Sequence, residues 1–155
     1  MNISYDQCAT ILGQVGETIV SNYLISEGFK VYKSTDYFDS QKDFLLDGKK
    51  IEIKTKQPYV LKNAFSFEPN QLRKCLNVDD LYFVSVPPLF KKDYKYGGYI
   101  FRINPKEMRH FTYTTKGGTR MVAVPIEQPA MSRCAKIADR DVEQLIKYAQ
   151  SDYQR

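Results

Sequence analysis

Residues 42–55 read KDFLLDGKKIEIKT, and this pattern predicts a β-hairpin. Asp47 and Gly48 lie between two apolar-patterned runs and form a favoured centre for a two-residue type I′ turn, because both turn positions need a positive φ. Side chains alternate between the two faces of a strand, so we expect Phe44, Leu46, Ile51 and Ile53 on a core face and Asp43, Glu52 and Lys54 on the other.

The second face of this hairpin places two carboxylates, those of Asp43 and Glu52, directly opposite each other. Like charges in this position destabilise a hairpin, because their Cβ atoms are only about 5 Å apart. A divalent cation would offset the repulsion: Mg²⁺ typically takes one or two protein carboxylates and keeps its other positions for water and phosphate. Lys54 would then lie beside the metal, where it could position an attacking water or stabilise charge on a scissile phosphate.

A second interpretation of the same hairpin needs no metal. Lys49, Lys50 and Lys54 would solvate a surface strand and neutralise Asp43 and Glu52. An Asp…Glu-x-Lys pattern also arises often by chance. The hairpin by itself therefore leaves both interpretations open.

Length and composition indicate one globular domain. The chain has 155 residues, of which 43% are hydrophobic and 26% charged, enough to build a core of its own. It contains no run of the roughly 20 apolar residues that a membrane span needs, and residues 1–6 lack the pattern of a signal peptide. Cys8, Cys75 and Cys134 are far apart and show no zinc spacing, so we expect reduced cysteines and a cytoplasmic protein.

Charge and motif content narrow the function classes. The formal net charge is +5 at pH 7, which is compatible with a nucleic-acid partner without proving one. His110 is the only histidine, so the chain offers few residues for a His-based catalytic triad or a zinc site. We expect His110 on the surface. No glycine-rich phosphate-binding loop is present. The cysteines are expected to be small core or boundary residues.

Hydrophobic periodicity and turn residues predict the order of the other elements. Gly13 and Gly16 lie in the first helix, where small residues permit the close approach of another backbone. The expected class is α/β, with one central sheet flanked by helices. The predicted elements are a helix at 7–27 that ends before Gly28, a strand at 29–33, the hairpin, a helix at 69–77, strands at 81–86 and 98–103, a second hairpin around 116–119 and a helix at 139–148, with loops at 34–41, 58–64 and 89–98.

This order, with an acidic residue on the first helix and Asp…Glu-x-Lys on the next hairpin, resembles the PD-(D/E)XK nuclease superfamily, which has the restriction-endonuclease-like fold. The resemblance covers roughly residues 13–86 of the single domain 1–155, and residues 87–155 would be a family-variable elaboration. It implies a central mixed β-sheet flanked by helices, with an additional C-terminal β-hairpin and helix. The position of the proline in the motif's name is Lys42 here, and that position varies widely in the superfamily.

The resemblance also implies roles for individual residues. Gly13 to Glu17 fits a Gly-x-x-x-Glu pattern found on the first helix of many members, including Holliday-junction resolvases, and Gln71 matches a glutamine that some members carry on the helix after the Glu-x-Lys strand. The implied metal ligands are the side chains of Asp43, Glu52 and Glu17 and the backbone carbonyl of Ile53. The implied catalytic set is Glu17, Asp43, Glu52, Lys54 and Gln71.

The activity that the resemblance implies is Mg²⁺-dependent hydrolysis of a DNA phosphodiester by an in-line water, with Mn²⁺ expected to substitute. Surface lysines and arginines would bind the DNA backbone, which makes the affinity salt-dependent. Cleavage of a duplex needs two sites, so a homodimer or a higher symmetric oligomer is expected.

Several alternatives stay open at this point. The DNA substrate would be a four-way junction, as in resolvases, a specific duplex site, as in small restriction enzymes, or a long intron-insertion site, as in homing endonucleases of this fold. Residues 89–98 and 111–124 are rich in Tyr and Lys and would supply base-reading strands or loops for the last two. A different class is a non-catalytic DNA-binding or assembly module that kept the fold, and binding of a divalent metal would discriminate against it.

Overall fold

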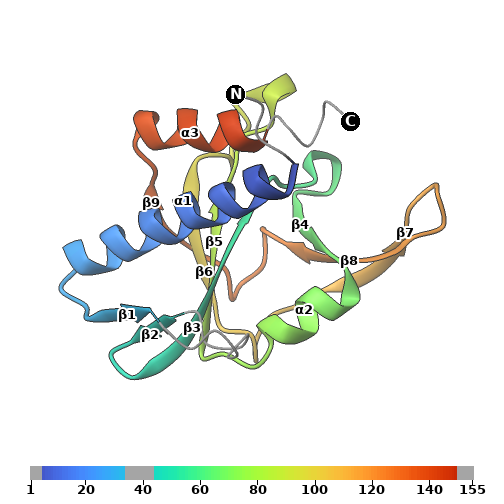
Figure 1. Ribbon diagram of the computed structural model, residues 1–155. Coiled ribbons are helices and arrows are strands. Elements are labelled where there is room, and N and C mark those ends of the chain that lie inside the picture. Colours follow the sequence, from blue (N-terminus) through green and yellow to red (C-terminus); the bar gives the residue numbers. More distant parts are fainter. Residues whose placement is uncertain (1–4, 34–43, 150–155) are drawn as a thin grey trace.

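The computed structural model describes residues 5–33 and 44–149 and shows an α/β protein with a mixed central sheet and three helices (Figure 1). Asp43, Lys42 and the predicted loop at 34–41 lie outside the described residues. The elements in chain order are α1 (Tyr5–Ser26), β1 (Val31–Lys33), β2 (Phe44–Leu46), β3 (Lys49–Lys56), the 3-10 turn η1 (Val60–Lys62), β4 (Ala64–Phe67), α2 (Pro69–Cys75), β5 (Asp80–Ser85), η2 (Leu89–Lys91), β6 (Tyr99–Ile103), β7 (Phe111–Thr114), β8 (Arg120–Pro125), β9 (Ser132–Lys136) and α3 (Asp139–Ala149).

The central sheet has six strands in the order β1-β2-β3-β5-β6-β9. Strands β3 and β5 run parallel, and the other neighbours in the sheet are antiparallel. A parallel pair needs a crossover connection, and the segment between β3 and β5 contains β4 and α2. Figure 1 shows α1 and α3 together on one side of the sheet, with β4, α2 and the β7–β8 hairpin away from them.

Two hydrophobic cores lie on the two faces of this sheet. The first packs α1 and α3 against the sheet through residues such as Leu24 and Leu145. The second packs α2 and the smaller sheet against the opposite face through residues such as Leu72 and Phe65. Strand β5 supplies both, because alternate side chains point to opposite faces. Its members are Tyr82 and Val84 in the first core and Leu81 and Phe83 in the second, as expected for a strand buried on both sides.

The hairpin at residues 44–56 has the predicted register, because Phe44 pairs with Ile51 and Leu46 pairs with Lys49. Asp47 and Gly48 have φ values of 48° and 83°, as a type I′ turn requires. The Asp47 carboxylate also accepts a hydrogen bond from the Lys30 backbone N–H at 3.1 Å, which fixes the turn against the chain that leaves α1.

Helix α1 approaches β3 closely at Gly16. A Cβ atom built on Gly16 would lie 1.7 Å from Thr55 Oγ1 and 2.9 Å from Thr55 Cβ. No atom lies within 4 Å of the corresponding position on Gly13. The close approach predicted for the two glycines is therefore made at Gly16, which fixes the distance between the helix and the strand that carries Glu52.

The structure corrects the predicted architecture at several points. The protein has two sheets, because β8 pairs with β4 as well as with β7 in a three-stranded sheet of order β4-β8-β7. Strand β4 was not predicted, since it has only four residues before the helix-starting Pro69. Strand β9 was missed because it is an edge strand whose sequence, SRCAK, has no apolar alternation. The first strand is also shorter than predicted, and α2 ends at Cys75.

The remaining helices agree with the sequence analysis. Gly28 has a φ of 90° just after α1, and Phe29 N–H donates to the Leu24 carbonyl at 3.0 Å, which closes the end of the helix. Helix α3 begins at Asp139 with acidic residues in its first turn. Among the described residues, no helix combines the length and the apolar character needed to cross a membrane.

Candidate functional site

Strand β3, in the interior of the sheet, carries a buried carboxylate that is paired with a partly exposed lysine. Glu52 is 5% exposed, and its Oε1 lies 3.1 Å from Lys54 Nζ. Their side chains lie on the same face of β3 because they are two residues apart. Ionised carboxylates are rarely buried without a partner, since desolvation costs several kcal/mol per ion. Glu52 therefore does not belong to a solvated strand face, whereas Lys49 and Lys50 are exposed.

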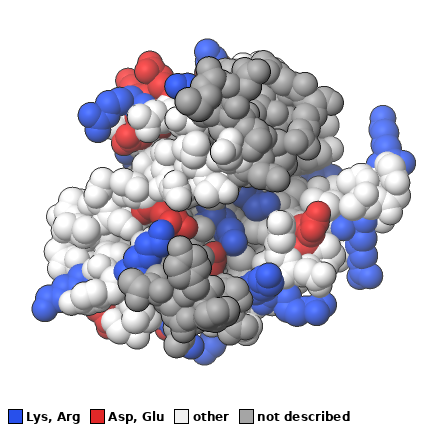
Figure 2. Space-filling view, viewed as in Figure 1, with Lys and Arg blue, Asp and Glu red and all other residues white. Residues whose placement is uncertain are grey.

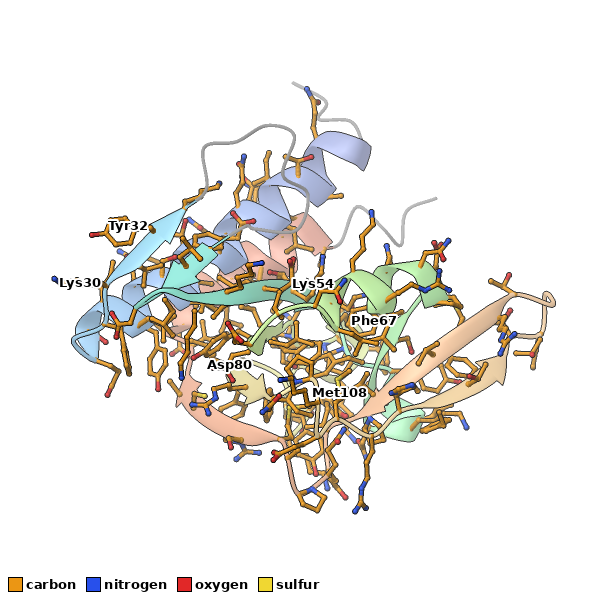
Figure 3. All side chains as sticks on the ribbon, turned by 90° about the horizontal axis from the view of Figure 1, so that it is seen from below. Lys30, Tyr32, Lys54, Phe67, Asp80 and Met108 are labelled. Carbon is orange, nitrogen blue, oxygen red and sulfur yellow. The ribbon has the colours of Figure 1, made fainter. Side chains whose placement is uncertain are left out.

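Lys56 extends this row of side chains along β3. Its Nζ donates a hydrogen bond to the Ser66 carbonyl at 2.6 Å and lies 4.2 Å from the centre of the Phe67 ring. Burial and the nearby positive charge of Lys54 lower the pKa of Lys56 to about 8. Figure 3 shows Lys54 on β3 and Phe67 at the end of β4. Lys56 was not among the predicted site residues, although its two-residue spacing from Lys54 was the available signal.

Gln71 lies beside Lys56 in a pocket of about 430 Å³. Its Oε1 accepts a hydrogen bond from the Glu68 backbone N–H at 3.4 Å and completes a capping box at the start of α2. Gln71 therefore has a structural partner and also faces the pocket. The lining residues of that pocket are Leu12, Thr55, Lys56, Gln57, Ser66, Gln71 and Ala149.

Glu17 is located differently from the other predicted site residues. Its Oε2 lies 3.3 Å from Lys33 Nζ, and its side chain is 24% exposed. It lines a second pocket of about 380 Å³ together with Lys33 and Phe44. Helix α1 packs on the face of β3 that carries Ile53 and Thr55, so Glu17 comes from the side of the strand opposite to Glu52. The structure therefore brings Glu52 and Lys54 together and pairs Glu17 with Lys33.

The backbone carbonyl of Ile53 points to an edge of β3 that lacks a described strand partner. The carbonyls of Lys50 and Lys56 accept hydrogen bonds from the β5 side, at 2.8 Å from Asp79 N and 2.9 Å from Val86 N. Carbonyls alternate in direction along a strand, so the Ile53 carbonyl points to the other edge. There β2 pairs with β3 only as far as Ile51 among the described residues.

The donor set that the structure describes is suited to a hard cation but is small. It consists of the Glu52 carboxylate and the Ile53 carbonyl, both oxygen ligands of the type that Mg²⁺ prefers. Within residues 5–33 and 44–149, no group of three or more His, Cys, Asp or Glu side chains is arranged to hold a metal ion. Asp43, the second carboxylate of the predicted site, directly precedes β2 and lies outside the described residues.

No protein-family model matches the chain, and a search of curated proteins finds no significant relative.

Lys56 gives the fold a testable pH dependence. In the folded protein, Lys56 loses its proton at a pKa of about 8. In the unfolded chain, the same group keeps its proton up to its ordinary pKa of 10.5. Between these two values the unfolded state binds more protons, so the free energy of unfolding rises with pH, by up to about 3 kcal/mol.

We expect this rise to be absent from Lys56→Met. Urea unfolding of wild type and variant at pH 7 and at pH 10 measures it, because the other titrating groups cancel in the difference. An identical pH dependence in the two proteins would show that the Lys56 ammonium is not desolvated in the folded state.

Proposed function

We propose that this protein is a Mg²⁺-dependent DNA endonuclease of the PD-(D/E)XK kind. The observation that carries the proposal is the buried carboxylate of Glu52 held 3.1 Å from Lys54 Nζ on one face of the central strand β3. The carboxylate is almost fully buried, whereas the Lys54 side chain is 34% exposed, and a carboxylate kept out of water in this way contributes little to stability compared with an apolar side chain of similar volume. Its presence in the sheet is therefore better explained by chemistry than by folding.

The order of elements supports the same proposal. The chain runs α1-β1-β2-β3, with the three strands adjacent and antiparallel, and then passes through α2 to β5, which is parallel to β3. This is the part of the chain on which the resemblance to the superfamily rests. It places Glu52 and Lys54 on β3, which pairs with β5 from Ile51 to Lys56, and strand elements hold side chains more precisely than loops do.

In the proposed mechanism, Glu52, Asp43 and the Ile53 carbonyl would hold Mg²⁺. The bound ion would polarise the scissile phosphate and lower the pKa of a coordinated water. Lys54 orients the attacking water and stabilises the negative charge that develops on the phosphate. Glu17 would serve an outer or second ion only if it left its ion pair with Lys33 and reached around β3, because it comes from the side of the strand opposite to Glu52.

Cleavage assays test the activity and separate its substrate classes. Supercoiled plasmid and a synthetic four-way junction would be incubated with the protein in Mg²⁺, Mn²⁺ or EDTA. We expect cutting in either metal and none in EDTA. Discrete plasmid fragments would favour a restriction or homing enzyme, and symmetric nicks at the junction would favour a resolvase. Sedimentation of the protein with its substrate would show whether two copies act together.

Lys54→Met tests the role of the lysine separately from that of the metal. Removing the ammonium while keeping most of the side-chain volume should lower the cleavage rate by about 100- to 1,000-fold, the usual effect of losing one charge-stabilising group. Mn²⁺ binding should persist, because Lys54 is not a ligand. Lys50→Met is the matched control, since Lys50 lies on the same hairpin but is exposed. Equal loss of activity in both variants would argue against a specific role for Lys54.

A further inference from the structure

The β7–β8 hairpin is a two-stranded ribbon that extends away from the rest of the protein (Figure 1). Its tip is well defined: Thr115 N–H donates to the Thr119 carbonyl at 2.9 Å, and Gly118 N–H donates to the Thr115 carbonyl at 2.9 Å. Residues 114–120 are all exposed. Beyond the second core, therefore, neither face of the ribbon's tip is covered by another described part of the protein.

The charge of this ribbon has one sign. The sequence from Met108 to Ile126 contains no Asp or Glu, whereas Arg109, Lys116 and Arg120 are positive and exposed. Figure 2 shows Lys and Arg side chains projecting from this arm. A surface that carries only positive charge on a protruding element is complementary to a polyanion.

The other segment that could contact DNA, residues 89–98, has a different character. Tyr94 is 4% exposed and donates a hydrogen bond to Asn63 Oδ1 at 2.6 Å. Lys95 Nζ lies 3.2 Å from Glu127 Oε1, so its charge is locally compensated. This segment contains a buried anchor and a neutralised lysine, and it is a weaker candidate than the ribbon.

The base of the ribbon is connected to the strand that carries the candidate site. The Tyr113 hydroxyl lies 2.8 Å from Ser66 Oγ, and the Ser66 carbonyl accepts the hydrogen bond from Lys56 Nζ. Lys56 is two residues from Lys54, a separation of about 7 Å along a strand. Two residues from outside the ribbon also contact its base: the Tyr59 ring centre lies 6.1 Å from that of Tyr113, and Lys62 Nζ lies 5.7 Å from the centre of the Phe111 ring.

We propose that the β7–β8 ribbon binds duplex DNA by entering its major groove, with Lys116 and Arg120 on the phosphates that border the groove. The inference rests on the proposed function, because it assigns the DNA-contacting element of that enzyme. A two-stranded ribbon fits the major groove of B-DNA, which is about 12 Å wide and 8.5 Å deep. The four residues of β7, Phe111–Thr114, span about 13 Å, which exceeds the depth of the groove.

The test is equilibrium binding of Lys116→Ala/Arg120→Ala to a fluorescent DNA duplex in EDTA, measured by anisotropy over a range of salt concentrations. Lys30→Ala/Arg140→Ala is the matched control, because it removes the same charge from exposed residues outside the ribbon. Loss of two phosphate contacts should weaken binding about 10- to 100-fold near 0.1 M salt and lower the salt slope by about 2. The control should bind like the wild type.

A duplex RNA of the same sequence supplies the second arm of the experiment. A-form RNA has a deep, narrow major groove that protein elements do not enter, so we expect weaker binding that is insensitive to the ribbon substitutions. The ribbon inference is overturned if the ribbon and control variants bind DNA equally well, or if the ribbon substitutions weaken DNA and RNA binding equally. If the variants bind alike but the wild type still cuts DNA in Mg²⁺, the ribbon inference fails and the proposed function stands.

Discussion

Replacing Glu52 by Gln is expected to abolish metal-dependent DNA cleavage. The substitution keeps the shape of the side chain but removes the charge that the structure buries at 5% exposure on β3. A metal-bound transition state derives several kcal/mol from its ion, and each 1.4 kcal/mol is a factor of ten in rate. We therefore expect a loss of about 1,000-fold or more, measured as the initial rate of plasmid nicking in Mg²⁺.

The matched control for this substitution is Glu143→Gln. Glu143 is an exposed residue of α3, so its loss removes one negative charge from a region outside the candidate site. Its cleavage rate should equal that of the wild type. Glu52→Gln should fold normally, since amide and carboxylate have nearly the same volume, and far-ultraviolet circular dichroism checks this. A folded Glu52→Gln protein that still cuts at the wild-type rate would exclude Glu52 from the chemistry.

Replacing Gly16 by Ala is expected to have the largest effect on stability. The new Cβ would lie 1.7 Å from Thr55 Oγ1 and 2.9 Å from Thr55 Cβ, so α1 or β3 must shift. Overpacking of this kind lowers the free energy of unfolding by about 1–3 kcal/mol. The higher helix propensity of alanine offsets up to about 1 kcal/mol of this loss. We expect a net loss of about 2 kcal/mol, seen as a fall in Tm of about 4–8 °C.

Gly13→Ala is the matched control, because it is in the same helix and has no atom within 4 Å of the new Cβ. It should stabilise the protein by up to about 1 kcal/mol through helix propensity alone. Adding Thr55→Ala to Gly16→Ala should recover part of the loss, with a coupling of about 1 kcal/mol. Equal effects at Gly13 and Gly16, or no coupling to Thr55, would contradict the close contact between helix and strand.

The hairpin was predictable from sequence because its information is local. Asp47-Gly48 dictates the turn, the turn dictates the register, and the register decides that Glu52 and Lys54 share a face. The ends of α1 and α3 and the buried strand β5 were predictable for the same reason. Each has a nearby signal in Gly28, Asp139 or a continuous apolar run.

The second sheet and the burial of the site were not predictable in the same way. Pairing of β4 with β8 joins segments about sixty residues apart, and nothing local in AFSF or RMVAVP specifies that partner. Strand β9 forms only because β6 offers an edge, and its own sequence is that of a loop. The position of Lys56 against Ser66 and Phe67 follows from this long-range packing, which is why the pattern alone did not identify it.

Calorimetric titration with Mn²⁺ tests for a metal site at Glu52 and requires no knowledge of the DNA target. We expect that the wild type binds Mn²⁺, that Lys54→Met binds it comparably and that Glu52→Gln does not. Absence of Mn²⁺ binding to the wild type, or equal binding by Glu52→Gln, would contradict a metal site at Glu52 and favour an inert module that has the fold without the activity.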